Sequence, residues 1–113
     1  MILRVVHLTG VGASPGVVTA CAHRVQTLSS ACETDLYGAL IITAAITPQW
    51  LPILAGCAGV VTERGGVTSH AATLCRELQK PCVVAVEDAL RLIPDGATVK
   101  IDGTAGSVDL LAE

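Results

Sequence analysis

Aromatic residues are almost missing from this chain of 113 residues, which has one Trp, one Tyr and no Phe. Without aromatic side chains among basic ones, there is no surface on which nucleic-acid bases would stack. The formal net charge of −3 also leaves no basic footprint for a phosphate backbone. We therefore expect no nucleic-acid partner. Hydrophobic residues still make up 51% of the sequence, so residues 1–113 should fold as a single domain around an aliphatic core.

The cysteines lack the spacing of a structural site. There are five, an odd number, and no two form a C-x-x-C pair; they are Cys21, Cys32, Cys57, Cys75 and Cys82. A disulfide framework or a zinc site would need such patterns. We predict no metal bound by this domain and mostly buried thiols in a reducing cytosol.

Long apolar runs and a charged leader are missing too. The chain does not begin with a basic region followed by an apolar one, so the sequence predicts no secretory signal. The longest mostly apolar stretch, residues 50–61, contains one proline and two glycines and is too short to span a bilayer. We expect a cytoplasmic protein with no membrane partner.

Residues 65–72 read Gly-Gly-Val-Thr-Ser-His-Ala-Ala and are the most informative stretch. Apolar residues then recur at helical spacing and predict a helix over Ser69–Gln79. Thr68 or Ser69 is suited to the N-cap, because its hydroxyl can accept a hydrogen bond from a first-turn N–H. His70 therefore falls beside unpaired backbone donors and the positive end of the helix dipole.

This position suits an anion better than a cation, so His70 should favour its neutral form, whose free ring nitrogen can attack phosphorus. A phosphoryl group there would carry roughly two negative charges and three acceptor oxygens. Backbone N–H groups near Gly65 and Gly66, with the hydroxyls of Thr68 and Ser69, are placed to bind it. Taken without its neighbours, His70 would be an ordinary histidine at a helix start.

The remaining sequence predicts short strands that alternate with helices. Strands are expected at 2–8, within 17–28, and at 39–44, 59–62, 82–86, 98–101 and 107–111. A short helix should run from Thr47, as N-cap, through Leu54, and residues 87–92 should form a helix or turn. Residues 10–16 and 26–35 are expected to be loops.

The glycines of residues 10–16 follow the spacing G-x-G-x-x-x-G, and the segment after them is β-type. A dinucleotide-binding fingerprint needs G-x-G-x-x-G at the start of a helix. We favour instead a turn that reverses the chain into a second strand.

Several short motifs follow one another in a fixed order along the chain: Ala13–Gly16, Thr47–Pro48, residues 62–72, Arg76–Leu78, Pro81–Val84, Asp102–Gly103 and Gly106–Val108. This ordered set resembles the phosphohistidine swivelling domain of the phosphoenolpyruvate-utilising enzymes. The family includes pyruvate phosphate dikinase, phosphoenolpyruvate synthase, the first enzyme of the sugar phosphotransferase system, and some antibiotic and glucan phosphotransferases. The likeness covers most of the chain.

The alternation of strands and helices predicts an α/β fold. The resemblance implies that this fold has three layers, β/β/α, and it alone supplies the second β layer. It also implies a phosphocarrier module of a phosphotransferase, whose His70 moves a phosphoryl group between an ATP site and a pyruvate or phosphoenolpyruvate site. Those sites would lie on partner domains, an ATP-grasp domain and a phosphoenolpyruvate/pyruvate-binding domain. Mg²⁺ is expected there. This domain would bind no cofactor and would not turn over alone.

Other residues carry open alternatives. Arg64 either donates a charge-assisted hydrogen bond to the phosphoryl group or is a solvated loop charge. Arg76 is interpreted as structural or interdomain rather than catalytic. The resemblance adds a regulatory possibility at Thr68, because the matching threonine of plant pyruvate phosphate dikinases is phosphorylated to inactivate them. Ala85 stands where the family usually has glycine, a small-for-small change.

Two alternatives come from other functional classes. The chain could be a non-catalytic lid or interaction domain that keeps the swivelling fold, or a swivelling subunit of a dehydratase-like enzyme. Both alternatives predict that His70 is dispensable. His7 and His23 carry no motif and are expected to be ordinary strand residues.

Overall fold

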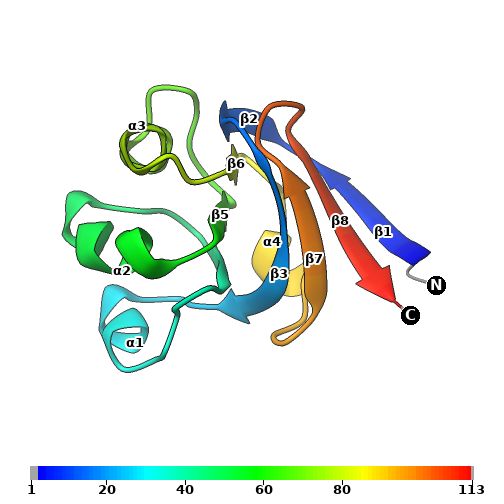
Figure 1. The fold of residues 1–113 in the computed structure, drawn as a ribbon, viewed down its shortest axis with the longest axis horizontal. Coiled ribbons are helices and arrows are strands. Elements are labelled where there is room, and N and C mark those ends of the chain that lie inside the picture. The colour runs from blue at the N-terminus through cyan, green and yellow to red at the C-terminus, as the bar shows by residue number, and fades with distance from the viewer. Residues whose placement is uncertain (1–2, 113) are drawn as a thin grey trace.

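The structure, a computed structural model, describes residues 3–112, which form three layers (Figure 1). The helical elements are α1 (Leu28–Cys32), the 3₁₀ turn η1 (Pro48–Trp50), α2 (Leu51–Gly56), α3 (His70–Leu78) and α4 (Ala89–Leu92). The strands are β1 (Leu3–Thr9), β2 (Val11–Ser14), β3 (Val17–Arg24), β4 (Leu40–Thr43), β5 (Gly59–Thr62), β6 (Cys82–Val84), β7 (Thr98–Asp102) and β8 (Ser107–Ala112). The three-layer α/β prediction is confirmed.

The strands follow the order β1-β8-β7-β3-β4-β5-β6-β2. From β3 to β6 the strands are parallel, and β2 is added antiparallel to β6. From β1 to β3 the strands are antiparallel. Strand β3 takes part in both sheets, because Val17–Cys21 pairs with β7 and Ala22–Arg24 pairs with β4. One curved strand therefore joins the two β layers (Figure 1).

The aliphatic core lies in two parts, one on each side of the central sheet. Ile41 faces the helices α1, α2 and α3, where it is buried in one cluster with Trp50 and Leu54. Its neighbours Leu40 and Ile42 face the second sheet and belong to the other cluster. Strand β4 is thus covered on both faces, which explains its continuous aliphatic sequence.

Residues 10–16 are not the loop that the sequence predicts, because β2 occupies most of them. Their glycines serve close packing of backbones. A Cβ on Gly10 would lie 2.4 Å from the Val84 oxygen, and one on Gly12 would lie 2.5 Å from the Gly103 oxygen. The turn from β2 into β3 consists of Pro15 and Gly16 alone. Gly16 has φ +124°, a backbone conformation that requires glycine.

Two helical predictions also need correction. The expected loop at 26–35 contains α1, whose N-cap Thr27 accepts a hydrogen bond from Ser30 N at 3.0 Å. The helix expected over 47–54 is split into η1 and α2, and Thr47 makes no side-chain capping bond. Of the strand expected at 2–8, Ile2 lies outside the described residues. No helix within residues 3–112 has both the length and the apolar character needed to cross a membrane.

Candidate functional site

Helix α3 begins at His70 because Ser69 caps it. The Ser69 backbone is extended, and its hydroxyl oxygen accepts a hydrogen bond from Ala72 N at 3.4 Å. The same hydroxyl donates to the Gly66 carbonyl at 2.8 Å. The predicted helix is confirmed, and Ser69 rather than Thr68 is its cap.

His70 is exposed at the first position of this helix. The opposite side of α3 packs on the central sheet through Ala71, Ala72 and Cys75, which are all buried. Because the helix buries these small residues, the imidazole is left on the surface, where a tetrahedral anion has room to approach. The helix ends at Gln79 in the left-handed conformation, with φ 58°.

The loop that leads to His70 is fixed firmly at its base. Directly after β5, the Glu63 N–H donates to the Thr43 carbonyl at 3.1 Å, and the Arg64 N–H donates to the Ala44 carbonyl at 2.9 Å. The Thr62 hydroxyl donates to the Arg64 carbonyl at 2.7 Å. These bonds continue the pairing of β4 with β5, so the free part of the loop starts at residue 65.

From there the loop presents donors rather than acceptors. The backbone N–H groups of Gly65, Gly66, Val67 and Thr68 have no hydrogen-bond acceptor among residues 3–112. Gly65 has φ +126°, and a Cβ there would lie 3.0 Å from Ser69 Oγ, so a glycine is needed. A Cβ on Gly66 would meet nothing within 4 Å. Unpaired N–H groups before a helix N-terminus form a setting that suits an anion.

The predicted phosphate-binding residues therefore lie in one loop, but their side chains differ in whether they are already hydrogen-bonded. Thr68 and Arg64 are exposed, and neither side chain is hydrogen-bonded within the described part of the chain. The Ser69 hydroxyl proton is engaged with the Gly66 carbonyl. Phosphate contact by Arg64, Gly65, Gly66, Thr68 and Ser69 stays a prediction.

Arg76, in the second half of α3, contacts both strand β2 and the loop that precedes His70. Its Nη1 donates to the Ala13 carbonyl of β2 at 3.0 Å, and its Nη2 donates to the Val67 carbonyl at 2.8 Å. These contacts agree with a structural interpretation of Arg76. No sequence pattern indicates them, since Ala13 and Arg76 are 63 positions apart.

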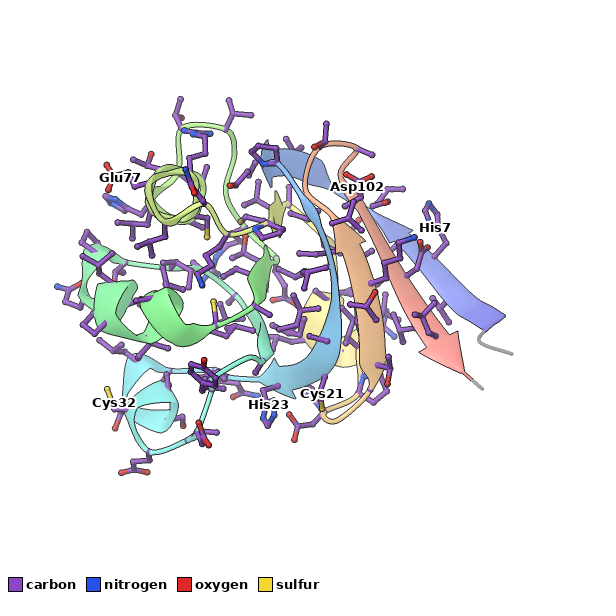
Figure 2. The ribbon with its side chains drawn as sticks, viewed as in Figure 1. His7, Cys21, His23, Cys32, Glu77 and Asp102 are labelled. Carbon is purple, nitrogen blue, oxygen red and sulfur yellow. The ribbon has the colours of Figure 1, made fainter. Side chains whose placement is uncertain are left out.

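The other two histidines lie away from this loop, on β1 and β3 (Figure 2). His7 Nδ1 is 2.5 Å from Asp109 Oδ1 on the neighbouring strand β8. His23 pairs through its backbone with β4. Both are strand residues, as predicted. Within residues 3–112, no three His, Cys, Asp or Glu side chains gather closely enough to hold a metal ion.

Three of the five cysteines are buried under the helical layer, and Cys21 and Cys32 are exposed (Figure 2). Burial raises the pKa of the Cys57 thiol to about 11, and the nearby Cys75 adds to the effect. A hydrogen bond to Cys75, together with burial, raises the pKa of Cys82. The prediction of mostly buried thiols is confirmed. Cys57 and Cys82 are held in the neutral form, whereas the hydrogen bond with Cys82 lowers the pKa of Cys75.

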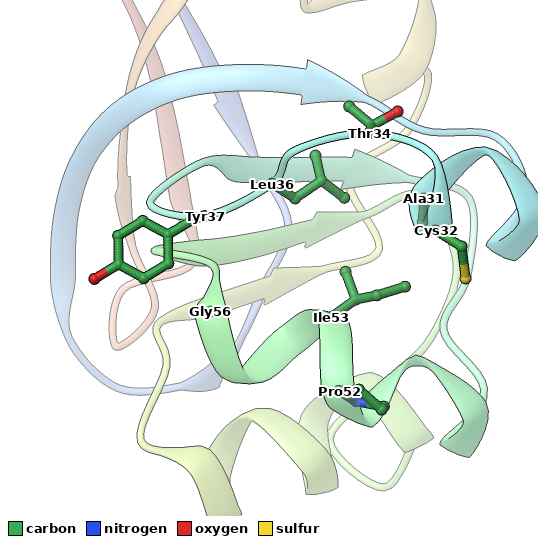
Figure 3. A pocket seen from close by; sticks show the side chains of 8 residues that line it. All are labelled: Ala31, Cys32, Thr34, Leu36, Tyr37, Pro52, Ile53 and Gly56. Atoms are coloured by element: carbon green, nitrogen blue, oxygen red, sulfur yellow. The ribbon is translucent and has the colours of Figure 1, made fainter.

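The surface formed by residues 3–112 includes hollows near α1 and α3. One of about 230 Å³ lies between α1 and α2, with Cys32, Tyr37 and Ile53 among its lining residues (Figure 3). The other, of about 450 Å³, is lined by Ser14, Pro15, Arg76 and Gln79 beside α3. The Ser14 hydroxyl is buried without a hydrogen-bond partner. His70 lines neither hollow.

Residues 37–106 match the family model described as PEP-utilising enzyme, mobile domain. Over 106 residues, 93% of the chain, the sequence is 39% identical to a rifampicin phosphotransferase from Streptomyces. Over 103 residues, 89% of the chain, it is 41% identical to phosphoenolpyruvate synthase from Pyrococcus furiosus. The chain spans only 12% of the length of each of these relatives.

Two solved structures that share the fold differ in their sequence identity to this chain and in how much of each chain is matched. An Enzyme I structure determined by NMR has 28% identity and a TM-score of 0.59; the match covers 68% of this chain and 34% of that one. The crystal structure of Thermococcus kodakaraensis aconitase X in its holo-form has 13% identity and a TM-score of 0.73. That match covers 94% of this chain and 98% of the other.

Proposed function

The chain belongs to the PEP-utilising enzyme mobile-domain family, and on this premise we propose that it is a phosphocarrier module of a phosphotransferase. His70 is the group that is transiently phosphorylated. The observation that carries the proposal is the exposed imidazole of His70 at the start of α3, next to a loop whose N–H groups lack acceptors. Relatives that are named phosphotransferase and phosphoenolpyruvate synthase match over the same region.

The transfer is a displacement at phosphorus. The lone pair of one neutral ring nitrogen of His70 forms the N–P bond. The bond from phosphorus to the donor oxygen breaks, and that oxygen leaves with its electron pair. The other ring nitrogen then releases its proton and removes the positive charge from the ring. In the second transfer, the other ring nitrogen takes back a proton, the acceptor oxygen attacks phosphorus, and the N–P bond breaks so that its electron pair returns to the neutral imidazole.

The surroundings of His70 suit each step. The unpaired N–H groups of residues 65–68 and the helix N-terminus favour a phosphoryl dianion at this place. The ring is exposed, so two different partner sites can reach it in turn. The donor and acceptor sites, with Mg²⁺, belong on partner domains, an ATP-grasp domain and a phosphoenolpyruvate/pyruvate-binding domain. A covalent carrier then links substrates that are bound too far apart for direct transfer.

The test is transfer of a radiolabelled phosphoryl group from phosphoenolpyruvate to this chain. The partner is Pyrococcus furiosus phosphoenolpyruvate synthase from which the segment matched by this chain has been removed. We expect label that is lost in acid and retained in alkali, as for a phosphorus–nitrogen bond. His70→Ala should abolish the label, and the matched control His23→Ala should keep it. Label that survives in His70→Ala would refute the assignment.

A second candidate is a swivelling subunit of a dehydratase-like enzyme, or a lid that has no chemistry of its own. The fold comparison favours it, because the aconitase X chain is matched over 98% of its length and with a higher TM-score than Enzyme I. At 13% identity that likeness concerns the fold alone. Under this candidate, His70→Ala would retain full function with its partner and the wild-type chain would take no label from phosphoenolpyruvate.

A further inference from the structure

Side chains hold the carbonyl oxygens of the loop that precedes His70. The Thr62 hydroxyl donates to the Arg64 carbonyl at 2.7 Å. The Ser69 hydroxyl donates to the Gly66 carbonyl at 2.8 Å. The Arg76 guanidinium donates to the Val67 carbonyl at 2.8 Å. Three peptide groups of this loop are therefore fixed from their carbonyl side.

Fixing a carbonyl also fixes the N–H of the next residue. All peptide bonds among the described residues are trans, and in a planar trans peptide the C=O and N–H point in opposite directions. The bonds above therefore direct the N–H groups of Gly65, Val67 and Thr68 away from the side chains that hold their carbonyls. None of these three N–H groups has an acceptor within residues 3–112.

Arg76 differs from the other two side chains because it is anchored elsewhere in the fold. Its second nitrogen donates to the Ala13 carbonyl of β2 at 3.0 Å, and β2 is paired with β6 at the edge of the central sheet. Val67 is an exposed residue in the middle of the loop. The planar guanidinium thus braces the loop against a strand, a geometry that one ammonium group cannot reproduce.

We propose that Arg76 is a positioning residue for phosphotransfer. By holding the Val67 carbonyl against β2, it keeps the Thr68 N–H aimed at the phosphoryl group that His70 carries. This inference rests on the proposed function, and it assigns Arg76 no contact with the phosphoryl group itself. Since misplacement of a binding group by about 1 Å can cost a hundredfold in rate, loss of this brace should be measurable without unfolding the domain.

The experiment has two readouts on the whole chain. In the first, inorganic phosphate is titrated into isotope-labelled protein while the NMR amide signals of residues 65–70 are followed. In the second, phosphoramidate, a small phosphoryl donor that needs no partner domain, is used to measure the rate at which His70 is phosphorylated. The variants are Arg76→Gln and Arg76→Lys. The matched control is Arg91→Gln, because Arg91 is an exposed arginine on α4 whose recorded partner is Asp88.

In the wild-type chain, phosphate should shift the Gly65, Val67 and Thr68 amides. Arg76→Gln should weaken phosphate binding and slow the phosphoramidate reaction by about tenfold each. Arg76→Lys should recover only part of the phosphate affinity and of the phosphoramidate reaction rate, and Arg91→Gln should change neither quantity. Amide signals of β8 report whether each variant is folded, and a purely structural role would move them together with the loop signals.

Two outcomes would overturn the inference: wild-type loop amides that do not respond to phosphate, or an Arg76→Gln chain that binds phosphate and reacts as the wild type does. Failure of the proposed function looks different. In that case no phosphohistidine forms with phosphoenolpyruvate and the partner enzyme, whereas phosphate binding by the loop still depends on Arg76.

Discussion

The Glu63 carboxylate accepts a hydrogen bond from the backbone N–H of Leu90, with Oε2 3.1 Å from the nitrogen. Glu63 directly follows β5, at the base of the loop that carries His70, and Leu90 lies in the first turn of α4. Helix α4 packs in the cluster between the two sheets, on the side of the central sheet opposite α3. This bond therefore ties the His70 loop to the layer behind it.

Glu63→Ala should lower the free energy of unfolding by about 1–2 kcal/mol, because it leaves the Leu90 N–H without its acceptor. Glu63→Gln should lose less, since the amide oxygen can still accept. Urea denaturation measures both. The control is Glu77→Ala on the exposed face of α3, which should change stability by less than about 0.5 kcal/mol. Equal losses for Glu63→Ala and Glu77→Ala would contradict the role of the Glu63 bond.

Ala85→Gly should raise the free energy of unfolding by about 1 kcal/mol. Ala85 has φ +58°, where a Cβ is strained and glycine is not. The left-handed backbone at Ala85 also interrupts the extended conformation, so β6 ends at Val84 rather than at the predicted residue 86. Thermal and urea denaturation provide the measurement. Ala45→Gly in an exposed segment of ordinary φ should slightly destabilise the chain, and a similar loss at Ala85 would show that no strain is stored there.

Ser69→Ala should cost about 1 kcal/mol of stability, because it removes the side-chain cap of α3. It also frees the Gly66 carbonyl, so hydrogen exchange should become faster at the first turn of α3. Thr68→Ala, one position earlier, should stay within about 0.5 kcal/mol of the wild type. If Thr68→Ala were the more damaging change, the cap would be assigned to the wrong residue.

The free energy of unfolding should fall as the pH rises above about 9. Burial raises the pKa of Cys57 to about 11 in the folded chain, above the ordinary thiol value of 9.0. Between these values the unfolded thiol loses its proton while the folded one keeps it, so stability decreases with pH through this window. The expected contribution is on the order of 2 kcal/mol. Cys57→Ala should flatten the profile from pH 9 to 11 relative to the wild type, and an unchanged slope would exclude Cys57 as its source.

Thiol reagents should modify two of the five cysteines in the folded chain. Cys21 and Cys32 are exposed, and the other three are buried. A buried thiol reacts slowly because the reagent cannot reach its sulfur without an opening of the fold. Colour yield with a disulfide reagent at pH 8 counts the reactive thiols before and after denaturation. Rapid reaction of a third thiol would mean that the layer under α3 opens readily.

Sequence reasoning succeeded where local chemistry decides the structure. Strand β5 was predicted with its observed bounds, since a short run of aliphatic residues between glycine-rich segments fits a strand buried on both faces. Helix α3 was predicted to within a residue, because the Ser69 hydroxyl and the apolar spacing both act within the helix itself. The exposed position of His70 follows from the same pattern.

Prediction from the sequence failed where contacts between residues far apart in the chain determine the local structure. Gly10 and Gly12 resemble loop residues in the sequence, but the reason for them is the closeness of Val84 and Gly103 in the fold. Helix α1 has only five residues, too few to show an apolar periodicity, so its polar sequence predicts a loop. The bond from Arg76 to Ala13 depends on β2 forming beside α3, which no local pattern encodes.

The pairing of β1 with β8 has a consequence for how this fold can be built into other proteins. Leu3 lies opposite Ala112 in an antiparallel register, at the outer edge of the second sheet (Figure 1). A polypeptide that enters at one of these positions and leaves at the other does so at neighbouring points. The unit can therefore be inserted into a longer host chain through two adjacent antiparallel strands, so that the two points of connection with the host lie side by side.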